Sequence, residues 1–450
     1  MPRYDYTKTM MMKLFMARPD GRGGSVVECD VERAMAIVRQ VDALTLGVPK
    51  IIYLVGWQFD GHDDKYPAFD EVNPALKRQE DETPLESMLW LMEQAKNFNT
   101  VISVHINFAD AYDNSPLIYA YREKNALIRD RNGRPAAVEE YNGLPCYKVS
   151  YKEEWESGLF HERVKTLLKL LPLRQAGTVH VDNFQCYVNR KPKVDIKTMQ
   201  AYRKKMIDYL AQKGIDTTSE FTYREGPLTA LFYGNIVRGF LWRRYPVDTL
   251  GQLPAVWWVD KLKKREVFNY YPQKYAGGLL KGKYGEILYG NIHGEELWRL
   301  NGGDANAQTD ANAWHKEFLR QFAATNIPYF YLATLQKEKL AGRGKKLRMV
   351  YTDGTVSYRH AQKIAKNGVL MKINDDLLLP VMFKDDMRIA YSKNGCKRTW
   401  QLPMCGYKSA KLYDISAEGL QLIGETPVDH GGILLDVAPG QAMLVELFKQ

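Results

Sequence analysis

Two carboxylate residues end apolar segments that have the character of β-strands. Asp182 ends the segment 177–182, and Glu220 ends the segment 215–220, 38 positions later. A strand, a helix and a second strand consume about that many residues, so the two strands are expected to be neighbours about 4.8 Å apart. Carboxylates at neighbouring strand ends can face one another across a pocket. Such a pair is the minimum equipment for glycoside hydrolysis, in which one group attacks or stabilises the anomeric carbon and the other protonates the leaving oxygen and activates water.

Further polar side chains stand near the ends of other predicted strands. His62 and Asp63 follow the strand predicted over 50–57, and His105 and Asn107 lie at the end of the strand predicted over 101–107. Gln185 follows the segment that ends at residue 182. In a parallel barrel the active site lies at the C-terminal ends of the strands. We therefore expect these five side chains to line the same pocket as the two carboxylates.

Several of these residues have a structural alternative. A carboxylate at a strand end is often a helix N-cap or a partner for arginine, although Asp182 is not followed at once by a helix. Trp257 and Trp258 could stack on the apolar face of a sugar ring or fill a core, and the sequence leaves both open. The distance between the carboxylates, which decides between retention and inversion of configuration, is also left open.

A metal site is the chemical alternative for part of this set. His62, Asp63 and His105 are residue types that bind zinc. The chain has no HExxH motif and no pair of histidines four residues apart, which are the patterns that would carry a zinc prediction. We predict no metal.

Strand and helix signals alternate through the first three quarters of the chain. Asp30 is a good N-cap for a helix over 30–44, and Thr83 with Glu86 forms a capping box at the start of the next. Strands are predicted over 50–57, 101–107, 177–182, 215–220 and 327–332, and helices over 30–44, from 83, over about 152–171, 197–213 and 314–323. This alternation predicts a parallel sheet covered by helices, in a barrel or a large doubly wound sheet. Of the two we expect a (β/α)8 barrel.

The pattern changes after residue 339. Short apolar segments separated by turn residues such as Asp353-Gly354 and Asn394-Gly395 predict antiparallel strands. We expect residues 1–339 to form the catalytic barrel with an N-terminal extension, and residues 340–450 to form a β-sandwich of the usual size for such a domain.

Composition excludes some classes of protein. The chain has 450 residues and a net charge of +10, from 63 basic and 53 acidic side chains. Its densest basic clusters, at 261–265 and 343–348, are short, and no nucleic-acid-binding motif accompanies them. Five cysteines lack the pattern of a disulfide framework, and no apolar run has the length of a membrane span. We expect a cytoplasmic protein that binds neither nucleic acid nor membrane, and leave its oligomeric state open.

The strand-end motifs together resemble the catalytic domains of glycoside hydrolase families 101 and 129. The similar segments are YLVGWQ at 53–58, GHD at 61–63, VHIN at 104–107, AY at 111–112, VHVD at 179–182, SE at 219–220 and IPYFYL at 327–332. The similarity covers about residues 45–340, and the order and spacing of the motifs make it more specific than any one of them. These families cleave α-linked N-acetylgalactosamine from mucin-type glycans.

The resemblance implies a function and roles for the residues. Asp182 would be the nucleophile and Glu220 the general acid/base of a retaining α-N-acetylgalactosaminidase. Asp63, helped by His62 and Asn107, would bind sugar hydroxyls, and Trp257 and Trp258 are candidates for the aromatic lid of family 101. No metal or nucleotide cofactor would be needed. The alternative is a non-catalytic carbohydrate-binding protein on a degenerate barrel, and the sugar and the exo or endo mode stay open.

Overall fold

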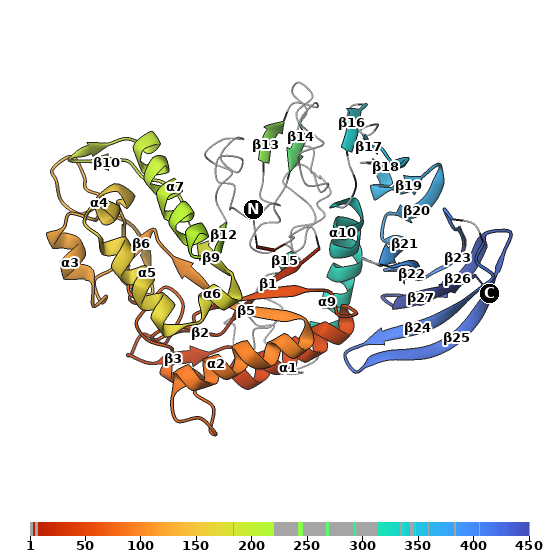
Figure 1. Ribbon diagram of the computed structural model, residues 1–450, viewed down its shortest axis with the longest axis horizontal. Coiled ribbons are helices and arrows are strands. Elements are labelled where there is room, and N and C mark those ends of the chain that lie inside the picture. The colour runs from red at the N-terminus through yellow and green to blue at the C-terminus, as the bar shows by residue number, and fades with distance from the viewer. Residues whose placement is uncertain are drawn as a thin grey trace.

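The computed structural model describes most of the chain in two parts that lie side by side (Figure 1). The described residues are 3–4, 8–182, 184–219, 242–245, 267–269, 292–293 and 314–449, apart from 334, 336, 343–345, 347, 359, 382–383 and 405. The first part is a parallel sheet with helices, and the second is a large antiparallel sheet. Within the described residues, no helix is long and apolar enough to cross a membrane.

A parallel sheet of six strands forms the centre of the first part. Its spatial order is β12, β9, β5, β4, β1, β15. The strands are β1 (Met10–Phe15), β4 (Lys50–Val55), β5 (Thr100–Asn107), β9 (Thr178–Asp182), β12 (Asp216–Ser219) and β15 (Ile292–His293). Every residue of β1 and β4 is buried, as expected for parallel strands covered on both faces.

Helices follow the strands and cover the sheet, as the alternation predicted. They are α1 (Val31–Leu44), α2 (Pro84–Gln94), α3 (Ile118–Glu123), α4 (Tyr151–Glu156), α5 (Leu159–Leu170), α6 (Leu173–Ala176) and α7 (Ile196–Gln212). The Asp30 side chain accepts from the backbone N–H of Arg33 and caps α1. The capping box of Thr83 and Glu86 is present at the start of α2. Figure 1 shows α1 and α2 along one side of the sheet and α4, α5 and α7 at its far end.

Two element predictions are wrong, and two strands of the parallel sheet, β1 and β15, were not predicted. The segment 327–332 is helical, α10 (Ile327–Ala333), and continues α9 (Trp314–Gln321) through the π-helical turn Phe322–Asn326. A short buried apolar run does not distinguish a strand from a helix, and α10 begins directly after the π-helical turn, with Pro328 as its second residue. The single helix predicted over 152–171 is two, because Gly158 between α4 and α5 has φ 84°. The methionine-rich β1 carries no turn or cap signal.

The strand order has one feature of a barrel. Strands β1, β4, β5, β9 and β12 are neighbours in chain order, and β15, a later strand, pairs in parallel with β1. This places a late strand beside the first one, as barrel closure requires. In the described residues the sheet runs open from β12 to β15, so the eight-stranded barrel stays a prediction.

The C-terminal part is an antiparallel sheet of twelve strands in the order β16–β22, β27, β24, β25, β26, β23. They are β16 (Lys337–Ala341), β17 (Arg348–Tyr351), β18 (Thr355–Tyr358), β19 (Ile364–Lys366), β20 (Val369–Ile373), β21 (Asp376–Val381), β22 (Lys384–Tyr391), β23 (Cys396–Gln401), β24 (Ser409–Ser416), β25 (Gly419–Asp429), β26 (Gly432–Val437) and β27 (Ala442–Phe448). The edge strand β23 lies beside β20, so the sheet curls round a core that includes Trp400, Ile433 and Val445.

Small sheets occupy the connections. The one that matters for the site has the order β6 (Asp110–Tyr112), β8 (Leu144–Lys148), β7 (Ala137–Tyr141) and lies between β5 and α4 in the chain. The others are β2 (Ala17–Pro19) with β3 (Ser25–Val27), β10 (Asn189–Arg190) with β11 (Lys193–Val194), and β13 (Trp242–Tyr245) with β14 (Val267–Asn269).

Candidate active site

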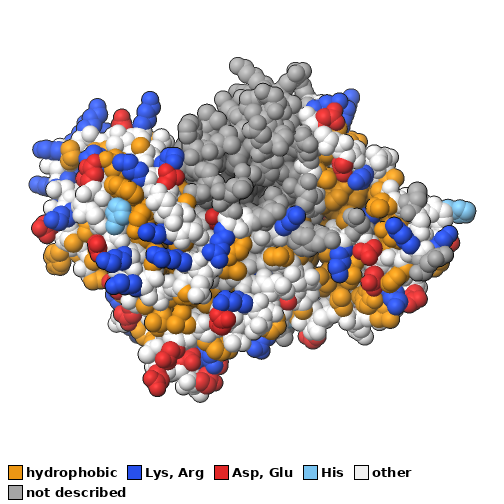
Figure 2. All heavy atoms as spheres, in the orientation of Figure 1, with side chains coloured by type: hydrophobic (Ala, Val, Ile, Leu, Met, Phe, Trp, Pro, Cys, Tyr) orange, Lys and Arg blue, Asp and Glu red, His pale blue; other side chains and the backbone are white. Residues whose placement is uncertain are grey.

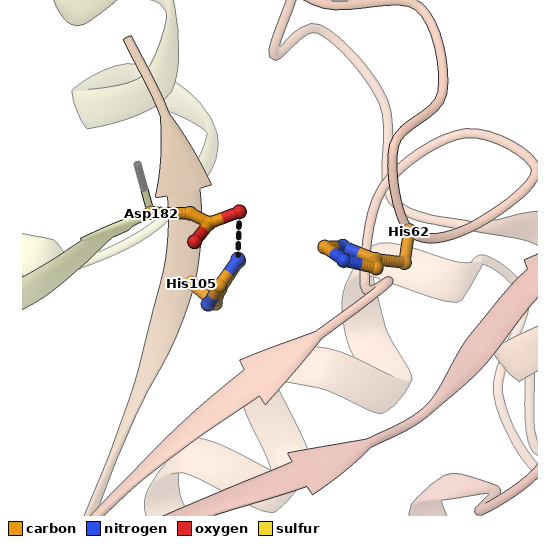
Figure 3. A group of neighbouring side chains, drawn as sticks. All are labelled: His62, His105 and Asp182. Carbon is orange, nitrogen blue, oxygen red and sulfur yellow. Dashed lines mark ion pairs between the residues drawn. The ribbon is translucent and has the colours of Figure 1, made fainter. Parts of the chain in front are cut away.

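Three of the predicted site residues meet at the C-terminal ends of the parallel strands. They are His62 in the loop after β4, His105 near the end of β5, and Asp182 at the end of β9. One ligand atom of each lies within 4.8 Å of the others, and His105 Nε2 is 3.6 Å from Asp182 Oδ2. Figure 3 shows the His62 ring pointing toward the other two. We call these three residues the His–His–Asp cluster.

The cluster is held by aromatic rings on both sides. The His105 ring stacks on that of His180 with centroids 5.5 Å apart, and meets the His62 ring edge-on at 5.3 Å. On its other side His62 meets Phe15 of β1 edge-on at 5.4 Å. His105 is fully buried and Asp182 is 9% exposed. The carboxylate is therefore the member of this pair with access to a ligand.

The loop after β4 is shaped by two glycines. Gly56 has φ 73°, and a Cβ there would lie 1.9 Å from the carbonyl oxygen of Ala17. A Cβ at Gly61 would lie 2.6 Å from Arg18 Cα. The loop can approach the chain after β1 only because both side chains are absent, and the His62 N–H then donates to Ala17 O at 2.9 Å.

Asp63 lies next to the cluster through the same loop. Its φ of 56° is left-handed, an uncommon conformation for aspartate outside turns and functional sites. Its Oδ2 is 3.3 Å from His62 Nε2. The Asn142 amide donates to the carbonyl oxygens of His62 and Asp63 at 3.2 and 3.1 Å, tying the loop to the turn between β7 and β8. Asp63 therefore lies beside the His–His–Asp cluster, and its role in binding sugar hydroxyls stays a prediction.

Asn107 has a mainly local role in the described structure. It pairs with Asp182 across the β5–β9 register. Its side-chain oxygen accepts from the N–H groups of Ala109 and Asp110, and its amide donates to Asp110 Oδ2 at 2.7 Å. Asn107 thus shapes the turn after β5 beside Asp182.

A buried ion pair lies beside this turn. Asp110 of β6 stands opposite Lys148 of β8 in the register, and Lys148 Nζ donates to Asp110 Oδ1 at 2.6 Å and to Glu139 Oε2 at 2.8 Å. Burial, assisted by the negative charges of Asp63 and Asp182 and opposed by Lys148, raises the pKa of Asp110 to about 6. Burial lowers the pKa of Lys148, but the charge of Asp110 and the hydrogen bonds to Asp110 and Glu139, with a contribution from Cys146, together outweigh it, so the net shift of the pKa is upward. The positive charge of Lys148 thus offsets part of the negative charge of the neighbouring carboxylates.

Two tyrosines complete the charged surroundings. The side chains of Tyr66 and Tyr112 are buried. Burial, followed by the negative charge of Asp63, raises both hydroxyl pKa values, and Asp182 and Asp110 respectively add to it. Both hydroxyls therefore keep their protons at neutral pH. Sequence reasoning did not assign a role to either tyrosine, nor to Asp110 or Lys148; the motif AY at 111–112 was the one signal near them.

The remaining predicted residues are not joined to the cluster by a described contact. Gln185 is half-buried, and its carbonyl oxygen accepts from the Tyr151 hydroxyl at 2.6 Å. Glu220, Trp257 and Trp258 lie outside the described residues. The last described residue before Glu220, Ser219, pairs with Val181, the residue before the cluster aspartate.

The geometry allows two kinds of chemistry. A partly exposed carboxylate beside a buried histidine can attack or stabilise an electron-poor carbon. Two imidazoles and a carboxylate are also a ligand set for zinc and other divalent transition metals, and the His–His–Asp cluster is the group within the described structure that could hold one. The same Asp182 oxygen cannot serve both at once.

Comparisons with known proteins point to one kind of enzyme. Residues 24–228 match the glycoside hydrolase family 101 model, described as endo-α-N-acetylgalactosaminidase. Among solved structures, the α-N-acetylgalactosaminidase NagBb from Bifidobacterium bifidum in complex with GalNAc is similar, with 14% identity over 80% of this chain and 58% of that chain and a TM-score of 0.50. A quadruple mutant of NagBb gives 12% identity over 79% and 57%, also with a TM-score of 0.50.

The match with an α-amylase from Geobacillus thermoleovorans in complex with acarbose covers all of both chains at 10% identity, with a TM-score of 0.48. In the NagBb matches this chain spans somewhat over half of the length of NagBb. At 12–14% identity, the likeness to NagBb shows a shared fold. No curated protein matches the chain in sequence.

Proposed function

We propose that this chain is a retaining glycosidase that acts on α-linked N-acetylgalactosamine or a related α-galactoside, since residues 24–228 match the glycoside hydrolase family 101 model. The observation that carries the proposal is Asp182, a carboxylate at a strand end with a buried histidine 3.6 Å away.

The proposed mechanism is a double displacement. Asp182 attacks the anomeric carbon while Glu220 protonates the leaving oxygen, and Glu220 then deprotonates the water that releases the sugar. Support for this pairing comes from the register, in which Ser219 pairs with Val181 and thereby brings the two strand ends together. A (β/α)8 barrel would present both residues on one face.

The surroundings of Asp182 suit a nucleophile. Asp63 lies next to His62 of the cluster, and the protonated hydroxyl of Tyr66 lies within the influence of the Asp182 charge. Both groups can bind sugar hydroxyls by hydrogen bonds. Lys148 offsets the accumulated negative charge.

Release of p-nitrophenol from p-nitrophenyl α-glycosides of GalNAc, Gal and Gal-β1,3-GalNAc tests the proposal. We expect release by the wild type and a loss of at least about 10³-fold in kcat for Asp182→Asn, whose fold should be unchanged because the amide has the same shape. The preferred sugar distinguishes exo from endo action. Binding of free sugars with no release from any member would contradict the enzyme and favour a carbohydrate-binding protein.

The same assay after treatment with a chelator separates the two chemistries of the His–His–Asp cluster. Under our mechanism the chelator leaves the rate unchanged. A rate that falls and is restored by a divalent metal would instead assign Asp182 as a ligand. Salt-dependent nucleic-acid binding is not expected, since Figure 2 shows Lys and Arg side chains mixed with acidic ones over the described surface of this face.

A further inference from the structure

The loop that carries His62 and Asp63 contains several residues in an uncommon backbone conformation. Residues 58–65 follow β4, and we call them the site loop. Phe59, Asp63 and Lys65 have φ of 45°, 56° and 55°, in the left-handed region that residues other than glycine rarely adopt. Such conformations persist only where the surrounding structure holds them. The contacts of the site loop therefore decide where its two site residues lie.

Two asparagine amides of the small sheet β6–β8–β7 and its connections hold the site loop. Asn142, in the turn between β7 and β8, donates to the carbonyl oxygens of His62 and Asp63 at 3.2 and 3.1 Å. Asn114, just after β6, donates to Asp64 Oδ1 at 2.7 Å. The segment inserted between β5 and α4 thus contacts the site loop at two places.

The hairpin of β7 and β8 gives the Asn142 amide a fixed position. Tyr141 pairs with Leu144, so two residues make the turn. At the other end of the hairpin, Lys148 is fully buried and its Nζ is 2.6 Å from Asp110 Oδ1. The exposed turn is therefore carried on a ladder that is anchored beside the turn after β5.

Turn formation alone could explain an asparagine at position 142. Asn142 and Gly143 have φ of 50° and 74°, and Asn-Gly is a preferred pair for a two-residue hairpin turn in which both residues are left-handed. The turn does not require the side-chain amide to contact carbonyl groups 79 and 80 positions earlier in the chain. Glycine adopts the left-handed conformation readily, so Asn142→Gly keeps the turn and removes this contact.

The two acceptors of the Asn142 amide lie on either side of one residue. The His62 carbonyl belongs to the peptide group before Asp63, and the Asp63 carbonyl belongs to the peptide group after it. Because each peptide group is planar, rotation of the Asp63 backbone would turn one of these oxygens away from the amide. The two hydrogen bonds therefore hold the left-handed conformation of Asp63, whose Oδ2 is 3.3 Å from His62 Nε2.

We infer that Asn142 is a positioning residue of the candidate active site. Its amide fixes the backbone of Asp63, and thereby the direction in which the Asp63 and His62 side chains point toward the sugar. Asn142 acts only through these two residues. The inference rests on the proposed function for its ligand, and its structural part is independent of any reaction.

Hydrogen exchange of the site loop tests the structural part on the full chain. The wild type is compared with Asn142→Gly and Asn125→Gly by exchange and peptide mass spectrometry. Asn125 is the matched control, because it is exposed, has φ 55°, and its side chain makes no hydrogen bond within the described part of the chain. We expect the amides of 58–65 to exchange at least about fivefold faster in Asn142→Gly and at the wild-type rate in the control. Unchanged exchange in Asn142→Gly would overturn the inference.

The p-nitrophenyl α-GalNAc assay measures the consequence for the site. We expect kcat/KM to fall at least about tenfold in Asn142→Gly, with a thermal midpoint within about 2 °C of that of Asn125→Gly. In an Asp63→Asn background the same substitution should change kcat/KM less than about twofold, because the carboxylate that Asn142 positions is already absent.

The two readouts separate this inference from the proposed function. Faster exchange of the site loop in Asn142→Gly, together with a wild type that releases no sugar, would contradict the glycosidase and support the role of Asn142 in holding the loop. Faster exchange with an unchanged kcat/KM, or an equal loss of kcat/KM in both backgrounds, would overturn Asn142 as a positioning residue.

Discussion

At the residue scale, the site depends on how several acidic groups are held together. The negative charges of Asp63 and Asp182 help to raise the pKa of Asp110, and the buried cation Lys148 forms an ion pair with Asp110. Asp110 has a folded pKa near 6 against an ordinary value of 3.8. The folded protein therefore binds this proton more tightly, and the contribution of Asp110 to stability falls as pH rises from about 4 to about 6.

Replacing Lys148 by methionine should lower the free energy of unfolding. Without the ammonium, Asp110 is left buried and unpaired, and breaking such a pair costs about 3–5 kcal/mol. We expect the loss in the free energy of unfolding to be larger at pH 8 than at pH 5. At pH 5 the Asp110 carboxyl can be protonated, and a neutral carboxyl is less costly to bury without a cation. Denaturant unfolding at the two pH values measures it.

Lys152→Met is the control for that measurement. Lys152 pairs with Glu156 four residues along α4 at the surface, where such pairs contribute about 0.3–0.5 kcal/mol. A loss for Lys148→Met that is equally small, or that is larger at pH 5, would contradict the proposed role of the buried pair.

At the element scale, the strands and caps of the parallel sheet could be predicted and parts of its surroundings could not. Apolar runs ending in polar residues identified β4, β5, β9 and β12, and these strand ends bring His62, His105 and Asp182 together. Asp110 and Lys148 were missed because their contact depends on the β6–β8 register, across 38 residues of chain. The strand predicted over 327–332 was wrong, since this segment forms the helix α10. A short apolar run has no periodicity that distinguishes a strand from a helix.

The loop that carries His62 and Asp63 should be sensitive at Gly56. In Gly56→Ala, a left-handed alanine costs about 1–2 kcal/mol, and the Cβ also meets the Ala17 carbonyl oxygen at 1.9 Å. We expect the free energy of unfolding and kcat both to fall. Gly143 has nearly the same φ, 74°, with nothing within 4 Å of an added Cβ.

Gly143→Ala therefore measures the energetic cost of a left-handed alanine without a steric clash. Thermal unfolding and the glycoside assay should show at most half the stability loss of Gly56→Ala and near-normal kcat. Equal effects of the two substitutions would mean that the close approach of the loop to Ala17 does not position the site.

At the scale of the whole molecule, the two parts share a core. One continuous cluster of buried side chains includes Met12 and Ile52 of the parallel sheet, Phe330 of α10, and Leu379 and Ile389 of the C-terminal sheet. The antiparallel sheet begins at Lys337 in β16 and packs against α10 through β21. We therefore expect the antiparallel sheet to stabilise the part that contains the parallel sheet.

A chain of residues 1–339 should not fold on its own. Removing the C-terminal sheet exposes the buried face of α10 and interrupts the shared cluster, and lost burial of this kind costs about 25 cal/mol per Å² of apolar surface. We expect the shortened chain to aggregate or to lack a cooperative thermal transition. A soluble, cooperatively unfolding and active product would show instead that the two parts are independent domains with a boundary near 339.

The proposed mechanism requires Asp182 to become covalently bonded to the sugar. Incubation with a 5-fluoro-α-galactosaminyl fluoride, which slows release of the intermediate, followed by peptide mass spectrometry tests this directly. We predict one fluorosugar adduct on the peptide that contains Asp182, and none in Asp182→Asn. An adduct on another residue, or an active enzyme that forms no adduct and releases the inverted sugar, would contradict the claim.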